Sequence, residues 1–365
     1  MANKKITDLP EASSITSNDY IVIDNGVASK KAKATVISDL AGTETDAKLA
    51  SYYTKTAADA LLAAKQDNLT AGHGIAIASN VISESFLAIA ENHNRIFRGE
   101  EITRYVTDGS LWNRIAGTNG FTPFEDIYLG DYIKMSRAIT APNIDSGSSG
   151  VTGSQYVMVA GINTLYGNGD SNAVTYPHLV MVPGQGKGGT QHFGQHRMNA
   201  TNTTVGGYKG SVMNTSVIGS VVSSGSTASG ATINQQLYAE FGSHLKTVRE
   251  LISNDINATG YNRFGTNSGC ANNWGWASFQ AILLTEVEAY GSIAWSSSGY
   301  DIGSGKVQLP AFALCTQALN NRSAWWWLRA VASATDFCYC SNRGTANYYN
   351  ASNTSYYVRP RFVLA

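Results

Sequence analysis

The C-terminal segment Asn320-Asn-Arg-Ser-Ala-Trp-Trp-Trp-Leu-Arg329 runs from a polar turn into three consecutive tryptophans. Successive side chains of a β-strand point to opposite faces, so two of these indoles share one face and the third lies on the other. Because an indole is large and mostly apolar, at least one of the two faces must be buried. The segment therefore predicts a strand that takes part in a folded core.

After this strand, a regular apolar frame is interrupted by polar and tyrosine-rich residues. The frame continues in Phe337-Cys-Tyr-Cys340, which we expect in a β-hairpin, and ends in Val358-Arg-Pro-Arg-Phe-Val-Leu364. The interrupting Tyr, Asn and Ser residues are typical of binding surfaces, because a stiff aromatic ring supplies contact area at low entropic cost and small polar side chains adapt their hydrogen bonds. The alternative is a polar pair of edge strands without a ligand.

The frame also follows a pattern found in a known family. The residues that carry it are Trp325-Trp-Trp-Leu-Arg329, Val331-Ala-Ser333, Phe337, Gly344, Ala346 and Val358-Arg-Pro-Arg-Phe-Val-Leu364. They resemble the C-terminal variable repeat of the proteins that diversity-generating retroelements target, the family of the phage major tropism determinant. Three upstream segments are similar to the same kind of domain: Leu283-Leu-Thr-Glu-Val-Glu-Ala-Tyr-Gly-Ser292, Trp295-Ser-Ser-Ser-Gly-Tyr300-Asp and Val307-Gln-Leu-Pro310. The resemblance implies a C-type-lectin-like fold.

The same resemblance implies which positions contact a ligand. In this family a reverse transcriptase copies template adenines imperfectly, so Asn codons become Tyr, Ser, Asp, Thr, Ala and other codons at solvent-facing positions. The expected ligand-contacting residues are Thr335, Asp336, Tyr339, Ser341, Asn342, Arg343, Thr345, Asn347, Tyr348, Tyr349, Asn350, Asn353, Ser355 and Tyr356. The sequence lacks the Glu-Pro-Asn and Gln-Pro-Asp patterns by which C-type lectins hold calcium and sugar, so we expect contact through the tyrosine-rich surface instead.

Residues 1–45 predict a small β-rich attachment module. Asn25-Gly26 separates the β-prone stretch Asp19-Tyr-Ile-Val-Ile-Asp24 from a second one that ends at Val36-Ile37, and this is a strong hairpin signal. The module has too few apolar residues for a core of its own, so we expect other chains or a docking partner to complete it.

Residues 46–100 predict a stalk. Apolar residues recur at three- and four-residue spacing and predict a short amphipathic helix that begins near Thr56: Leu49, Tyr52, Tyr53, Ala57, Ala60, Leu61 and Ala64. One such helix is marginal in water, whereas three packed together are stable, so the pattern favours a trimeric coiled coil. The alternative is a linker helix that packs on its own domain. A turn at Gly72 and Gly74, a strand and a helix over 84–97 follow.

Roughly the first 85 residues resemble phage tail-fibre and baseplate-appendage proteins, which are typically homotrimers. The matching segments are Met1-Ala-Asn-Lys-Lys-Ile-Thr-Asp-Leu-Pro10, Asp19-Tyr-Ile-Val-Ile-Asp24, Tyr53-Thr-Lys-Thr-Ala-Ala-Asp-Ala-Leu-Leu-Ala-Ala-Lys-Gln-Asp67 and Leu69-Thr-Ala-Gly-His-Gly-Ile75.

Residues 101–365 predict one large head, with a variable region over 320–365. Apolar residues at helical spacing predict helices near 233–252 and 278–290. Two stretches rich in Gly, Ser and Thr, Ser146–Gly153 and Val221–Gly230, predict long loops.

The charge of the chain argues against two classes of partner. Its 365 residues include 26 Lys and Arg against 26 Asp and Glu, and 14% are charged, compared with about 25% in typical soluble domains. Without clustered cations, binding to nucleic acid or to an anionic membrane surface is not expected. The sequence shows no apolar run of about 18 residues and no signal peptide, so we expect no membrane insertion and synthesis in the host cytoplasm.

Other chemistry has weak support. His192 and His196 would share a helix face, but no third metal ligand accompanies them. Four cysteines lack zinc-like spacing and are interpreted as free thiols: Cys270, Cys315, Cys338 and Cys340. Carboxylates for glycoside hydrolysis are few: Glu286, Glu288, Asp301 and Asp336. We expect no cofactor, no metal and no catalytic residue.

These expectations together describe an α+β phage appendage protein. We expect a homotrimer in the virion that binds other tail proteins through its N-terminus and a host-surface protein or glycan through its C-terminal surface. One rival is a structural decoration protein whose Tyr and Asn residues pack on neighbouring subunits. The other is an enzyme that degrades host-surface glycan.

Overall fold

The computed structural model describes residues 18–24, 29–33, 56–61, 75–78, 81–148, 150–253, 274–296, 307–322 and 324–365. The chain divides into two compact units. Unit one comprises residues 1–72 and 78–81, and unit two comprises residues 73–77 and 82–365.

Unit one contains the predicted hairpin. β1 (Tyr20–Asp24) pairs antiparallel with β2 (Ser29–Lys33), from Tyr20↔Lys33 to Asp24↔Ser29. The predicted turn at Asn25-Gly26 and the predicted strand end near Val36 lie outside the described residues. Residues 56–61 are helical, which confirms the helix predicted from Thr56, although most of the predicted apolar stripe also lies outside the described residues.

Short elements occupy the residues where the assignment changes from unit one to unit two. β3 (Ile75–Ala78) pairs with β4 (Val81–Glu84), and α3 (Phe86–His93) follows directly. The hydroxyl of Ser85 caps α3 by accepting a hydrogen bond from the Ala88 amide at 3.3 Å. This helix is shorter than the predicted stretch 84–97, since Asn94 ends it and its side-chain amide donates to the Ile162 carbonyl at 2.7 Å.

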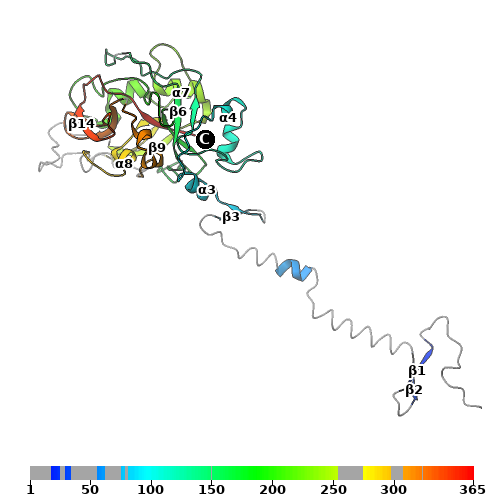
Figure 1. The fold of residues 1–365 in the computed structure, drawn as a ribbon. Coiled ribbons are helices and arrows are strands. Elements are labelled where there is room, and N and C mark those ends of the chain that lie inside the picture. The colour runs from blue at the N-terminus through cyan, green and yellow to red at the C-terminus, as the bar shows by residue number, and fades with distance from the viewer. Residues whose placement is uncertain are drawn as a thin grey trace, which may run out of the picture. The chain divides into compact units, whose positions relative to one another are not determined.

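A six-stranded antiparallel sheet forms the core of unit two (Figure 1). Its strands are β5 (Tyr132–Lys134), β6 (Tyr156–Ile162), β7 (Leu179–Pro183), β8 (Leu245–Lys246), β11 (Ala281–Leu283) and β15 (Pro360–Leu364). They are ordered β11-β15-β7-β6-β5, and β8 pairs with β15 next to β11. β15 therefore lies inside the sheet. It pairs with β7 along one side and with both β11 and β8 along the other.

The central strands are covered on both faces. Every residue of β7 and β15 is buried, as is every residue of β6 after Tyr156. Helices supply part of the cover, because α3 and α9 (Pro310–Leu314) contact β6. The helices of unit two beyond α3 are α4 (Thr103–Thr107), α5 (Leu111–Ala116), α6 (Gly207–Gly210), the π-helix η2 (Met213–Gly219), α7 (Ile233–Phe241), the 3-10 helix η3 (Gly242–His244), α8 (Glu286–Tyr290), α9 (Pro310–Leu314) and α10 (Thr316–Leu319).

The helix predicted over 233–252 is wrong after Phe241. α7 begins at a capping box formed by Thr232 and Gln235, but Gly242 adopts φ 56° and ends it. The chain then forms η3, β8 and β9 (Val248–Ser253). In β9 every second side chain points into the core: Val248, Glu250 and Ile252 are only 0–2% exposed. The charged residue in the middle of this alternation hides the strand pattern in the sequence.

The helix predicted over 278–290 is also wrong over its first half. β10 (Trp274–Phe279) and β11 occupy residues 274–283, and only Glu286–Tyr290 is helical. A capping box of Thr285 and Glu288 sets the start of α8. The predicted loops over 146–153 and 221–230 are confirmed as irregular in their described residues, because neither contains a helix or a strand.

Four charged side chains form a buried ionic cluster: Arg329, Arg361, Glu250 and Glu288, each at most 1% exposed. Arg361 contacts both Glu250 and Glu288 at 2.5 Å, and Arg329 lies 3.8 Å from Glu250. Burial alone would raise the pKa of Glu288, but the charges of Arg361 and Arg329 hold it below its ordinary value. The cluster thus balances two positive against two negative charges and joins β9, α8 and β15.

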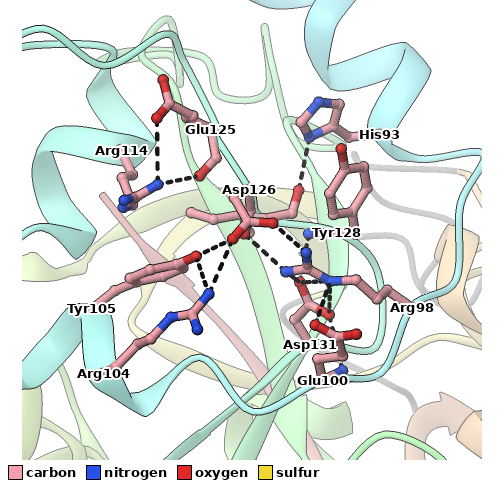
Figure 2. Close-up of polar contacts among 11 residues, drawn as sticks. His93, Arg98, Glu100, Arg104, Tyr105, Arg114, Glu125, Asp126, Tyr128 and Asp131 are labelled. Carbon is pink, nitrogen blue, oxygen red and sulfur yellow. Dashed lines mark hydrogen bonds and ion pairs between the residues drawn. The ribbon is translucent and has the colours of Figure 1, made fainter.

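A second polar cluster anchors the first helices of unit two to the loop before β5 (Figure 2). The Arg98 guanidinium donates to Asp131 at 2.6 Å and to both the carboxylate and the carbonyl of Asp126. Arg104 and Tyr105 also donate to the Asp126 carboxylate. Because these donors already satisfy both carboxylates, we interpret the cluster as structural.

Candidate ligand-binding surface

The tyrosine-rich segment lies in a three-stranded antiparallel sheet. Its strands are β12 (Trp326–Val331), β13 (Asp336–Cys340) and β14 (Ala346–Asn350), in that order. β13 pairs with β14 from Asp336↔Asn350 to Cys340↔Ala346, which confirms the predicted hairpin. β14 is the edge strand of this sheet and lies at the periphery of unit two (Figure 1).

Burial changes sharply across this sheet. All six residues of β12 are buried, and so are four of the five residues of β13. In β14, by contrast, residues 347–350 are all exposed. A packed apolar base therefore supports an edge strand whose side chains reach solvent on both faces. Aromatic side chains held in this way lose little freedom when they bind a partner.

Five aromatic side chains gather on one face of the sheet, and we call them the aromatic platform: Trp325, Trp327, Tyr339, Tyr349 and Tyr356. Tyr356 is the hub, with ring centroids 4.5 Å from Trp327 and 4.6 Å from Tyr339. The outer members Tyr349 and Trp325 lie 5.6 and 6.3 Å from the same ring. They are 46% and 42% exposed, so the platform has a buried base and an open top.

Tyr348 points to the opposite face, because neighbouring residues of a strand alternate. Its ring lies 5.0 Å from that of Trp295 in an edge arrangement and is 40% exposed. The Trp295 indole nitrogen donates to the Ala346 carbonyl at 3.1 Å and so ties the segment after α8 to the start of β14. The two adjacent tyrosines of β14 therefore lie on opposite faces of the sheet, Tyr349 with the aromatic platform and Tyr348 with Trp295.

The expected contact residues divide by exposure. The exposed ones are Thr335, Arg343, Thr345, Asn347, Tyr348, Tyr349, Asn350 and Ser355. Three are partly buried: Asp336, Asn342 and Asn353. The last three are buried, although we expected them to face solvent: Tyr339, Ser341 and Tyr356. The structure therefore brings most of these residues together on β14 and the turns beside it.

The buried members have structural partners that explain their position. Tyr339 and Tyr356 form the base of the aromatic platform, and burial raises the pKa of the Tyr356 hydroxyl, which stays protonated at neutral pH. The Ser341 hydroxyl accepts hydrogen bonds from the amides of Arg343 and Thr345 at 3.2 and 3.1 Å. Ser341 therefore shapes the turn between β13 and β14.

Sequence reasoning missed two members of this surface. Trp325 was expected only as part of a buried strand, but it precedes the first residue of β12 and stays exposed. Trp295 lies about fifty residues before β14 in the chain, so only the three-dimensional pairing with Tyr348 shows its role. The aromatic character of both residues was the one available signal.

The residues considered for other chemistry have different roles. His192 and His196 lie in an irregular segment and not on a helix, and His196 contacts the carbonyls of Arg197 and Ile144.

The carboxylates considered for glycoside hydrolysis are used within the fold. Glu286 accepts hydrogen bonds from the backbone amides of residues 294–296, and Glu288 belongs to the buried ionic cluster. Asp336 accepts hydrogen bonds from Ser333 and Thr335. Asp301 lies outside the described residues.

The described cysteines, Cys315, Cys338 and Cys340, are free thiols, while Cys270 lies outside the described residues. Among the residues that the structure describes, no group of three or more His, Cys, Asp or Glu side chains is placed to hold a metal ion. In the same part of the chain, none of the helices has the length and apolarity that crossing a membrane requires.

One comparison with known proteins bears on this surface. Residues 282–365 match a family model described as a domain of unknown function, DUF6273. The matched stretch contains α8, the three-stranded sheet and β15, and so includes all of the aromatic platform. No curated protein and no solved structure matches the chain.

Proposed function

We propose that this protein is a phage receptor-binding protein that attaches the particle to a host-surface ligand through the open top of the aromatic platform. The observation that carries the proposal is the pair of exposed rings, Tyr349 and Trp325, held against the buried ring of Tyr356. Large rings fixed on a packed base can bury much surface in a complex at little entropic cost.

The residues around the platform support recognition of variable partners. Asn347 and Asn350 are exposed on β14, and Thr345 and Ser355 are exposed on the flanking turns. Short polar side chains at the rim of an aromatic patch can change identity without disturbing the buried frame. This is the arrangement that a diversified binding surface requires, with residues 320–365 as its variable region.

In this proposal the head is C-type-lectin-like and residues 1–45 attach the protein to the virion. Residues 46–100 form the trimeric stalk. Three copies of a weak site on one particle act together, so that trimerisation raises the strength of attachment without new contacts.

Binding to cells tests the proposal. Fluorescently labelled full-length protein is applied to a panel of bacterial strains, and a strain that retains it is used for titration. The double variant Trp325→Ser/Tyr349→Ser should lower retention at least about tenfold, since hot-spot aromatic side chains each contribute 2 kcal/mol or more. Tyr166→Ser is the matched control, because Tyr166 is 43% exposed and contacts Phe86 outside the platform.

Unchanged retention of the double variant would contradict a binding role for the platform. Release of soluble saccharide from the cells by the pure protein would instead favour the glycan-degrading alternative. Sequencing the locus in a phage population tests diversification: a near-copy of the segment for residues 320–365 that differs mainly at adenines is expected, and invariant codons at the expected contact positions would contradict it.

A further inference from the structure

A cavity of about 610 Å³ lies at the turn between β13 and β14. Three separate segments line it: Lys187 after β7, residues 316, 317 and 319–322 in and after α10, and Arg343 with Gly344 in the turn itself. Arg343 is one of the expected contact positions. The cavity therefore adjoins the candidate surface through the β13–β14 turn.

The side chain of Asn320 holds the cavity wall in place. It is 7% exposed, and its amide nitrogen donates to the carbonyls of Ala324 and Ser341, both at 2.6 Å. Its amide oxygen accepts from the backbone of Arg322 at 2.9 Å, which supports the unusual φ of 68° at that residue. One buried amide thus fixes the chain beside Arg322 to the turn that carries Arg343.

A second buried amide ties the same lining segment to the chain after β7. Gln191, 2% exposed, donates to the Gln317 carbonyl at 2.8 Å and accepts from the Asn321 backbone at 3.2 Å. Asn321 in turn donates through its side chain to the Gly189 carbonyl at 2.9 Å. The cavity is therefore formed before any ligand binds, which lowers the entropic cost of binding.

The lining is positively charged. Lys187, Arg322 and Arg343 all line the cavity, and the residues that line it include no Asp or Glu. All three are exposed, and in the described part of the chain no ion pair involves any of them. In a chain with equal numbers of acidic and basic residues, three cations around one cavity without a counter-charge indicate an anionic ligand.

The rest of the lining offers polar groups that a ligand can reach. Thr316 and Gln317 line the cavity, and both are exposed. A threonine hydroxyl and a glutamine amide can pair with the hydroxyl groups of a sugar, which a simple inorganic anion lacks.

From these features we infer that the cavity binds an acidic carbohydrate, in which a carboxylate or phosphate group contacts Arg322 and Arg343 and hydroxyl groups contact the side chains of Thr316 and Gln317. Arginine suits this role because its planar guanidinium donates two parallel hydrogen bonds to either group. The inference rests on the proposed function and names the class of ligand that the head recognises beside the aromatic platform.

Titration calorimetry on the full-length protein tests the inference with four probes: sialyllactose, mannose 6-phosphate, neutral lactose and inorganic phosphate. We expect at least one acidic saccharide to bind at least tenfold more tightly than lactose and inorganic phosphate, and to weaken as salt is raised. Arg322→Gln and Arg343→Gln should each weaken it about tenfold, the usual effect of losing one charged hydrogen bond. Arg137→Gln, an exposed arginine outside the lining, should change nothing.

Equal affinity for acidic and neutral saccharides would overturn the inference, as would unchanged binding by the double variant Arg322→Gln/Arg343→Gln. Inorganic phosphate binding as tightly as the acidic sugars would reduce the cavity to a simple anion site and so refute the carbohydrate assignment. Retention on cells separates this inference from the proposed function: if no saccharide binds but Trp325→Ser/Tyr349→Ser still abolishes retention, the aromatic platform stands and the cavity does not.

Discussion

The ring of Tyr356 packs on the indole of Trp327, with centroids 4.5 Å apart and planes inclined by 34°. Tyr349 lies 5.6 Å from the same tyrosine ring, yet it is 46% exposed whereas Tyr356 is 7% exposed. Two tyrosines of one cluster therefore have different surroundings, so removing each ring should have a different effect on the free energy of unfolding.

We expect Tyr356→Ala to lower the free energy of unfolding by about 3 kcal/mol, because it leaves a cavity between Trp327 and Tyr339. Tyr349→Ala should change it by less than about 0.5 kcal/mol, since nearly half of that side chain already faces solvent on an edge strand. Urea denaturation of the two variants measures the difference. Tyr356→Phe keeps the ring and serves as the control. Equal losses for the two alanine variants would show that Tyr356 is not part of the packed base.

The sequence was most informative where a local signal coincides with the structure. Asn25-Gly26 predicts the hairpin of β1 and β2, and the Trp325–Trp327 run predicts the buried strand β12, both of which the structure confirms. These features depend on near neighbours in the chain, so residue order alone is sufficient to predict them.

The sequence was least informative where a distant partner decides the outcome. Glu250 occupies an inward position of β9 only because Arg361, more than a hundred residues later, neutralises it. Likewise, Tyr356 and Tyr349 look equivalent in the sequence, and only packing on Trp327 buries the first. The cavity beside the β13–β14 turn was missed for the same reason, because its three segments meet only in the folded chain.

The buried ionic cluster yields a stability prediction. Glu288→Gln removes one of the two carboxylates that contact Arg361, and this leaves a buried positive charge without its balance. We expect a loss of about 3 kcal/mol, typical of breaking a buried ion pair on one side. Glu91→Gln is the matched control, since Glu91 of α3 forms an exposed pair with Arg95, just after the helix, and the loss of this pair should cost less than about 1 kcal/mol. Thermal or urea unfolding measures the loss of stability in each variant. If Glu288→Gln lost as little stability as Glu91→Gln, the result would mean that water reaches Arg361 and replaces the missing carboxylate.

Two buried histidines predict sensitivity to acid. Burial lowers the pKa of His178 and of His192 to about 4 from an ordinary value of 6.5. The unfolded chain therefore binds protons below pH 6.5 that the folded chain does not, so stability is full above pH 6.5 and falls as the pH drops toward 4. At pH 5 the loss should be about 2 kcal/mol for each histidine.

Urea denaturation at pH 7 and pH 5 measures this loss. In His178→Gln the side chain at this position does not titrate. The variant should have a lower free energy of unfolding than the natural protein at pH 7, because it loses a buried imidazole. Between pH 7 and pH 5, however, its free energy of unfolding should fall by about 2 kcal/mol less than that of the natural protein. The hydrogen bond from the Leu165 amide to Nε2 of His178, 3.2 Å long, supports this assignment because the nitrogen must be unprotonated to accept it. A natural protein equally stable at both pH values would contradict the prediction.

The proposed trimer can be tested at one residue of the stalk helix. Leu61 is 45% exposed at the end of the helical residues 56–61 and belongs to the apolar stripe. If three stripes pack together, Leu61→Glu places three carboxylates in one apolar seam, and like charges there disfavour association. Light scattering on the full-length protein should then show the mass of a single chain in place of three.

Asp59→Asn provides the control, because two residues along a helix correspond to a rotation of about 200°, which places Asp59 away from the stripe. This variant should keep the trimeric mass. A natural protein with the mass of one chain would refute the trimeric stalk directly. A trimer that survives Leu61→Glu would show that association depends on surfaces other than this stripe, and the helix would then fit better as a linker packed on its own domain.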